Sequence, residues 1–131
     1  MGMMVAAVRG TRIEEAPLGP VVWLIDPDHW PRALLRAELL ERGYDAIGFA
    51  GVDEAILRLA TSHERRPRLV LLNLTGQVVT RGAVSLLGAG GVPVLGLAAA
   101  ATRDDALGLT AVLHRPLSLG ALADAITRRL Q

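Results

Sequence analysis

Four polar side chains stand at the ends of short apolar runs, and these residues could do chemistry. Asp26 and Asp28 follow the run VVWLI, Asn73 closes LVLL, and Arg115 comes soon after AVL. Hard cations prefer carboxylate ligands, whereas a guanidinium pairs with carboxylates or holds anions. Covalent catalysis at Asn73 would need a carboxylate, because an amide is not a nucleophile. Asn73 is therefore expected to hydrogen-bond locally and to take no covalent role.

Five apolar runs predict the strands that carry these side chains. Leu69–Leu72 is too short for a helix and is bounded by polar and turn residues, which is typical of a strand buried on both faces. The expected strands are Val21–Ile25, Tyr44–Phe49, Leu69–Leu72 with Asn73 at its end, Val92–Leu97 and Thr110–Leu113.

Helical patterns alternate with these strands. Asp28 is a favoured N-cap residue, so it predicts the start of a helix that runs to about Arg42 and stops at Gly43. The inner face of this helix is expected to hold Trp30, Leu34, Leu35 and Leu39, and that of a second helix, opened by Asp53, to hold Ile56, Leu57 and Leu59. The remaining helices are expected over 83–87, over barely two turns between Thr102 and Gly108, and after Ser118.

This alternation predicts an α/β fold in which helices cover both faces of a five-stranded parallel sheet, a three-layer doubly wound architecture. The leading topology is flavodoxin-like, with strand order 2-1-3-4-5. The ends of the first and third strands then meet at the switch point, where ligands gather in such sheets. Asp26 and Asn73 are expected to face each other there.

Composition restricts the class of protein. The 131 residues are 51% hydrophobic and 21% charged, a globular balance, and the net charge of +1 gives no general attraction to nucleic acid or to a membrane. The absence of cysteine excludes disulfides. No apolar run approaches the length of a membrane span, so a cytoplasmic protein is expected. Residues 1–20 are interpreted as an N-terminal extension, a leader or an apolar arm, and residues 21–131 as one domain.

The ordered set VVWLID, LLRAELLERGYDA, LVLLN, VPVLGLA and LHRPLS resembles the receiver domain of bacterial two-component response regulators. The resemblance covers about Val21–Leu130. It implies a site in which an aspartate on the third strand takes a phosphoryl group from a phosphohistidine. In that family, two further acids after the first strand complete a Mg²⁺ site. A hydroxyl residue after the fourth strand and a lysine after the fifth hold the phosphoryl oxygens.

The chain departs from this pattern at the metal and acceptor positions. Asp26 stands for the first acid, but Pro27 takes the place of the second and offers no ligand. Asn73 stands in place of the phosphoacceptor. Asp28 could face the pocket, although capping the first helix is its expected role. His29 lies beside these acids, but one histidine on a turn is a weak metal signal that a helix start explains. Magnesium is therefore not expected to bind well.

The remaining family positions also differ. Ala98 replaces the hydroxyl residue, Arg115 replaces the lysine, and Val112 stands where an aromatic residue would switch inward on phosphorylation. Arg115 and lysine are not equivalent at a site built for a compact ammonium. Arg115 is expected to pair with Asp26 or to contact Asn73, and so to occupy the place of the phosphate.

The expected function is that of a degenerate receiver, or pseudo-receiver: a phosphorylation-independent protein-interaction module in signalling or a phosphorelay, without enzymatic activity or cofactor. The partner would be a protein or a second copy, through the helix 4–strand 5–helix 5 face or the N-terminal arm. A shortened fourth helix should expose apolar surface there. One alternative is a small-ligand or anion sensor using the pocket around Asp26, Asn73 and Arg115. Another is a phosphoacceptor receiver with unusual residues.

Overall fold

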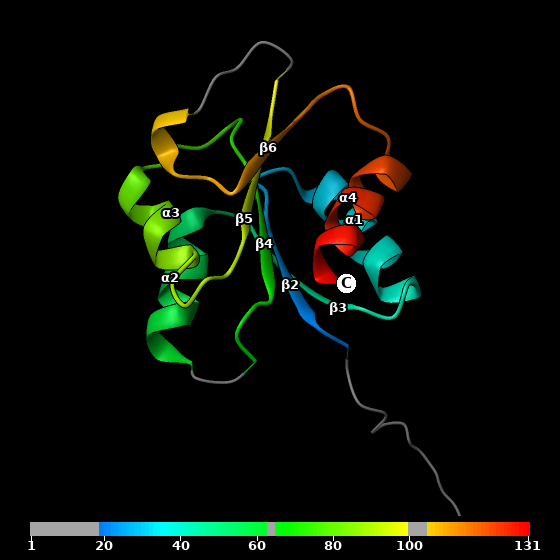
Figure 1. Ribbon diagram of the computed structural model, residues 1–131, viewed down its shortest axis with the longest axis horizontal. Helices are drawn as coiled ribbons and strands as arrows, with labels where there is room; N and C mark the ends of the chain where they lie inside the picture. Colours follow the sequence, from blue (N-terminus) through cyan, green and yellow to red (C-terminus); the bar gives the residue numbers. More distant parts are fainter. Residues whose placement is uncertain (1–18, 63–64, 100–104) are drawn as a thin grey trace, which may run out of the picture.

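The computed structural model describes residues 19–62, 65–99 and 105–131 (Figure 1). Its core is a five-stranded parallel sheet in the order β3-β2-β4-β5-β6. Counted along the chain this order is 2-1-3-4-5, so the predicted flavodoxin-like fold is confirmed. The strands are β2 (Val21–Ile25), β3 (Asp45–Phe49), β4 (Leu69–Asn73), β5 (Val94–Ala98) and β6 (Ala111–His114).

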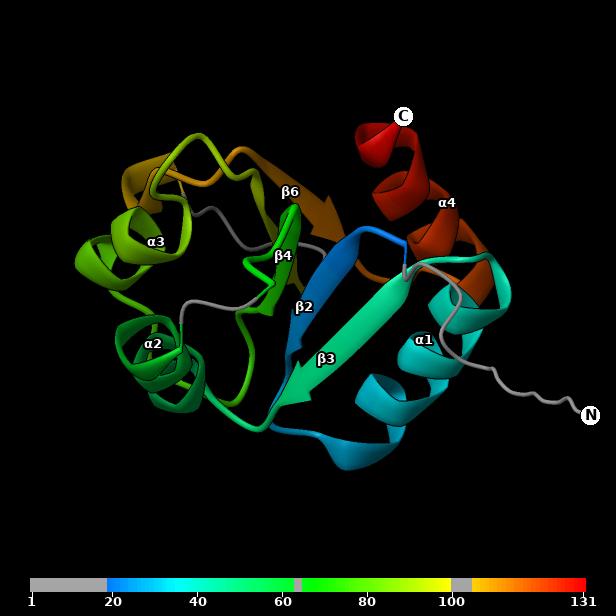
Figure 2. The ribbon, with the colours of Figure 1, turned by 90° about the horizontal axis from the view of Figure 1, so that it is seen from below.

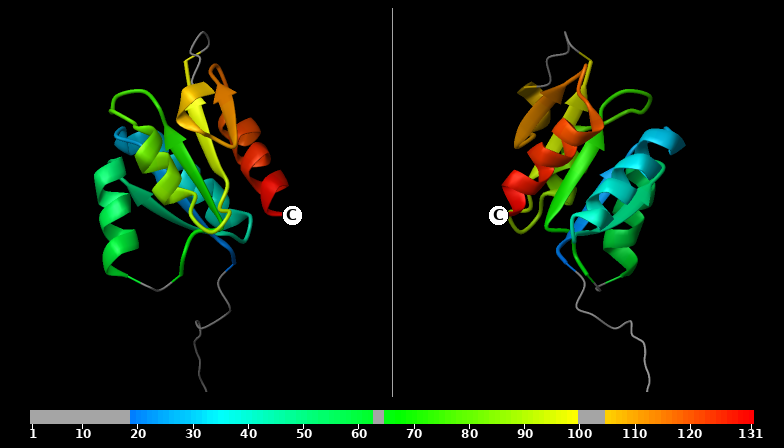
Figure 3. Two further views of the ribbon diagram at one scale, coloured as in Figure 1. Left: turned by 60° about the vertical axis from the view of Figure 1, so that its left-hand side comes forward. Right: turned by 90° about the vertical axis from the view of Figure 1, so that its right-hand side faces the viewer.

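Helices cover both faces of the sheet. Helices α1 and α4 lie side by side on one face, and α2 and α3 lie on the other, as Figures 1 and 2 show. The two further views in Figure 3 show the same three layers. The helices are α1 (His29–Glu41), α2 (Val52–Thr61), α3 (Arg81–Leu87) and α4 (Leu119–Leu130), with a 3-10 helix, η2 (Asp105–Leu107). No helix in the described part of the chain is both long and apolar enough to cross a membrane.

Strand β2 is apolar throughout because it is buried on both faces. Val21, Trp23 and Ile25 pack into the cluster under α2 and α3, whereas Val22 and Leu24 pack into the cluster under α1 and α4. Successive side chains on a strand point to opposite faces, so every position of a strand covered on both sides must be apolar. The first polar residue after the strand can appear only where the helices no longer cover it.

The buried face of α1 is narrower than the sequence pattern predicts. Leu35 and Leu39 are buried against the sheet, but Trp30 is 70% exposed and Leu34 is 55% exposed. One residue turns a helix by about 100°, so the Trp30–Leu34 row lies beside the Leu35–Leu39 row and misses the sheet. Leu57 on α2 is also exposed, at 62%. The predicted inner positions of these three residues are therefore wrong.

Where the fourth helix was expected, the described residues contain only the three residues of η2. The two turns expected between Thr102 and Gly108 do not form as an α-helix over the described part, and residues 102–104 lie outside it. The described residues therefore contain four α-helices where five helices were expected. The extension over residues 1–18 and the loop residues 63 and 64 also lie outside the described residues.

The buried Trp23 gives a first testable prediction. Its indole ring packs on Phe49 with 4.7 Å between ring centroids, but its Nε1 atom has no hydrogen-bond partner in the described residues. Removing an unsatisfied buried donor offsets part of the packing lost on truncation. Trp23→Phe should therefore change the free energy of unfolding by less than about 1 kcal/mol, whereas Leu39→Ala should cost about 2–5 kcal/mol. Urea denaturation followed by circular dichroism compares the two, and equal losses would contradict the prediction.

Candidate functional site

The register of the central strands brings Asp26 beside Asn73. Ile25 of β2 pairs with Leu72 of β4, so the residue that follows each of them lies at the carboxyl end of the sheet. There the Asn73 Nδ2 atom donates a hydrogen bond of 2.9 Å to the Asp26 Oδ1 atom. The two residues are only 7% and 9% exposed. This buried amide–carboxylate pair is the centre of the candidate site.

The orientation of the Asn73 amide is fixed by its three partners. Its Oδ1 atom accepts from the backbone N–H of Thr75 at 3.0 Å and from the Arg115 Nη1 atom at 3.4 Å. An ionised carboxylate only accepts, and the groups of Thr75 and Arg115 only donate. Reversing the amide would place donor against donor and acceptor against acceptor. The N–H₂ group therefore points to Asp26 and the oxygen points away from it.

Asp26 is held in place by further bonds. Its Oδ1 atom also accepts from the backbone N–H of Asp28 at 2.8 Å. The guanidinium of Arg32, on α1, donates to the main-chain carbonyl of Asp26. One carboxylate oxygen thus satisfies two donors, and the loop between β2 and α1 is tied to the end of β4.

Arg115 takes the second of its two expected partners. Its backbone N–H donates to the carbonyl of Ala98 at 2.9 Å, which fixes the start of the loop after β6 beside the end of β5. Its side chain reaches Asn73, and within the described residues it makes no ion pair with Asp26. The positive charge of Arg115 is therefore not neutralised by the carboxylate across the site.

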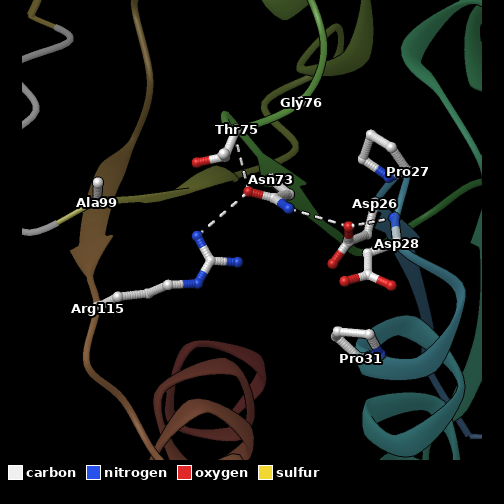
Figure 4. Close-up of a pocket in the computed structure, with 9 residues that line it drawn as sticks. All are labelled: Asp26, Pro27, Asp28, Pro31, Asn73, Thr75, Gly76, Ala99 and Arg115. Atoms are coloured by element: carbon white, nitrogen blue, oxygen red, sulfur yellow. Dashed lines mark hydrogen bonds between the residues drawn. The ribbon is translucent and has the colours of Figure 1, made fainter.

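A cavity of about 480 Å³ opens beside this network (Figure 4). The residue that lines it from the end of β5 is Ala99. Ala98 is 1% exposed and is not part of the lining, so its predicted place in the pocket is wrong; strand alternation turns its neighbour to the cavity instead. The lining consists of Asp26, Pro27, Asp28, Pro31, Asn73, Thr75, Gly76, Ala99 and Arg115.

Asp28 occupies the N-cap position of α1, but its side chain makes no capping hydrogen bond. The expected capping role is therefore wrong. The backbone N–H of Asp28 is already committed to Asp26, and its carboxylate lines the cavity instead (Figure 4). The side chain of Asp28 therefore contributes to the cavity and does not cap α1.

Two residues of the network were not predicted. Thr75 closes an Asx-type turn, in which the Asn73 side chain accepts from the N–H two residues on. An asparagine two residues before a threonine in a turn is the signal that could have found it. Gln77 donates to the Asn73 carbonyl at 2.7 Å and accepts from the N–H of Val52 at 3.1 Å, which ties the site to the start of α2. No local pattern marks that long-range contact.

The two N-caps give a second prediction. The Ser118 Oγ atom accepts from the backbone N–H of Ala121 at 3.0 Å, a side-chain cap that Asp28 does not make. Ser118→Ala should therefore cost about 1 kcal/mol of unfolding free energy. Asp28→Ala should cost less than about half of that, because it removes no capping bond. Paired thermal or urea denaturation measures both, and an equal loss would show that Asp28 caps α1.

The fold of this chain is similar to those of solved structures. No protein-family model and no curated protein matches the chain. A response regulator receiver protein from Burkholderia phymatum is 25% identical, with a TM-score of 0.69 over 85% of this chain and 94% of that one. One from Pseudomonas putida is 24% identical, with a TM-score of 0.68 over 86% and 99%. An orphan response regulator of H. pylori is 16% identical, with a TM-score of 0.70 over 88% and 100%.

The chain has the receiver fold. Its structural neighbours are response regulator receiver domains, and they match over nearly their whole length. Val112, the residue at the expected switch position, lies half-buried on β6, one of the two edge strands of the described sheet, and pairs with Gly96 of β5.

Proposed function

We propose that this chain is an atypical receiver that acts as a phosphorylation-independent protein-interaction module in two-component-type signalling, without catalysis. The observation that supports this most strongly is the hydrogen bond between Asn73 Nδ2 and Asp26 Oδ1. At the place where receivers carry a reactive carboxylate, this chain has an amide, and the amide is committed to a structural bond. An amide is not a nucleophile towards phosphorus.

The residues around Asp26 do not fit a magnesium ion. The Asn73 amide presents N–H donors to Asp26, where a metal would need an oxygen. Pro27 has no ligand atom on its side chain. In the described ranges, no group of three or more histidine, cysteine, aspartate or glutamate residues could hold a metal. We therefore propose that the protein works without Mg²⁺.

The face formed by η2, β6 and α4 is proposed to bind the protein partner, which is another protein or a second copy of this chain. In the described sheet, β6 is an edge strand, and its apolar residues Ala111, Val112 and Leu113 are only half-buried. Of the helix that would cover this side, the described residues contain only the single turn η2. Another protein chain can pair with an edge strand or pack on its accessible apolar residues.

The association state tests this function and is the third prediction. Sedimentation velocity of the protein should give the same distribution with and without acetyl phosphate and Mg²⁺, because no phosphoryl group arrives to change the η2–β6–α4 face. An ordinary receiver that dimerises on phosphorylation is the positive control. A shift of this protein to a larger or smaller species under phosphorylating conditions would contradict the proposed function.

The open cavity supports a second candidate function, a small-ligand sensor. An ion pair between Asp26 and Arg115 would have closed the site, but the described structure has a cavity of about 480 Å³ there instead. The polar side chains at the positions where receivers hold a phosphoryl group then line a binding space. The two candidates are compatible, because a ligand at this site could regulate the partner face.

A further inference from the structure

The cavity beside Asn73 carries opposite charges on opposite sides. Figure 4 shows the guanidinium of Arg115 on one side and the carboxylates of Asp26 and Asp28 on the other, with the Asn73 side chain between them. Within the described residues, no ion pair joins Arg115 to either carboxylate. One dipolar ligand can therefore satisfy both sides at once.

The separation of the two sides selects the ligand's length. Asp26 Oδ1 and Arg115 Nη1 bind the two ends of one amide, at 2.9 and 3.4 Å, so the distance between them is at most about 9 Å. The ammonium and carboxylate of an α-amino acid are about 3 Å apart, and a hydrogen bond of about 2.8 Å at each end lets such a ligand reach across a separation of up to about 9 Å. We propose that the cavity binds a free α-amino acid, with its ammonium against Asp26 and Asp28 and its carboxylate against Arg115.

An apolar groove lies next to the cavity and selects the ligand's side chain. It has a volume of about 260 Å³ and shares Pro31 and Arg115 with the charged cavity. Leu34 and Leu119 are 55% and 39% exposed at this groove. The rest of its lining is Leu97, Leu117 and Leu122. A branched aliphatic side chain such as that of leucine is the occupant that this lining suits, because burying it stabilises the complex through the hydrophobic effect.

The same charges disfavour simple ions. An anion at Arg115 is repelled by the carboxylates of Asp26 and Asp28, which leave the lining with a net negative charge. A metal cation would meet the guanidinium and the N–H₂ group of Asn73 in place of oxygen ligands. Only a ligand that carries both charges meets complementary groups at each end.

This inference rests on the proposed function, because the ligand takes the space that a phosphoryl group would use. Isothermal titration of the full chain with L-leucine, L-alanine, acetate, methylamine and inorganic phosphate tests it. Leucine should bind at least about tenfold more tightly than alanine, since its additional carbons enter the apolar groove. Acetate, methylamine and phosphate, each of which carries only one of the two charges, should give no measurable binding.

Variants identify the groups that hold each part of the ligand. Arg115→Gln and Asp28→Asn should each weaken leucine binding at least about tenfold, because each removes one charge-assisted contact. Arg128→Gln and Glu41→Gln make the same charge changes at exposed positions of α4 and α1 outside the cavity lining, and should leave binding unchanged. Leu119→Gln should reduce leucine affinity towards that of alanine without affecting alanine.

Three outcomes would overturn the inference. If the folded wild-type protein binds no leucine, the proposed amino-acid site is refuted. Binding of acetate or phosphate as tightly as leucine would make the site an anion site, and binding of methylamine as tightly would make it a cation site. None of these outcomes shows that the protein takes a phosphoryl group, so failure here is distinct from failure of the proposed function, which is read from sedimentation with and without acetyl phosphate and Mg²⁺.

Discussion

Asn73→Asp should lower the free energy of unfolding by about 1–3 kcal/mol when divalent cations are absent. The substitution replaces the N–H₂ donor that lies 2.9 Å from Asp26 Oδ1 with a carboxylate oxygen. Two buried carboxylates then face each other, and the side-chain hydrogen bond between Asp26 and the end of β4 is lost. Urea denaturation in the presence of a chelator measures the loss.

Addition of Mg²⁺ separates this explanation from simple misfolding of the variant. A cation between the two carboxylates should recover part of the lost stability in Asn73→Asp, because a ligand that binds only the folded state stabilises it. The wild-type protein is the control and should show no stabilisation by Mg²⁺. Equal stabilisation of both proteins would mean that the Asn73 amide does not exclude the metal.

Asp26→Ala should also cost about 1–3 kcal/mol of unfolding free energy, because it leaves two donors without their acceptor. These donors are the side chain of Asn73 and the backbone N–H of Asp28, which share one oxygen of Asp26. Denaturation with urea gives the size of the effect.

Asp26→Asn is the matched control for that prediction. It keeps an acceptor oxygen and removes only the charge, so its cost should be less than about 1 kcal/mol. A site built around a metal or an ion pair would need the charge and would respond alike to both substitutions. Equal losses in Asp26→Ala and Asp26→Asn would therefore contradict the hydrogen-bonded site described here.

The fold could be predicted because each central strand must be apolar on both faces. The runs that end at Ile25 and Leu72 mark β2 and β4 to within a residue, and their parallel register then places Asp26 beside Asn73. The residues on the inner faces of the helices were harder to predict than the strands. A helix with apolar residues on two neighbouring rows does not show which row meets the sheet, and in α1 only Leu35 and Leu39 do.

The details of the site depend on choices that no local pattern decides. Asp28 is a residue type that often caps helices. In this structure its backbone N–H donates to Asp26 and its carboxylate lines the cavity, so it makes no capping bond. Arg115 has a long side chain with many rotamers, so sequence alone left open whether Asp26 or Asn73 would be its partner. Gln77 joins the site through the loop after β4, whose path is set by tertiary contacts.

Intact mass after incubation with acetyl phosphate and Mg²⁺ tests the central claim most directly. The wild-type protein should keep its mass, because the residue at the acceptor position is an amide that is hydrogen-bonded to Asp26. An ordinary receiver treated in parallel is the positive control: it should gain one phosphoryl group, which shows that the acetyl phosphate is active. If the wild-type protein gains a phosphoryl group, the account of a phosphorylation-independent receiver is contradicted.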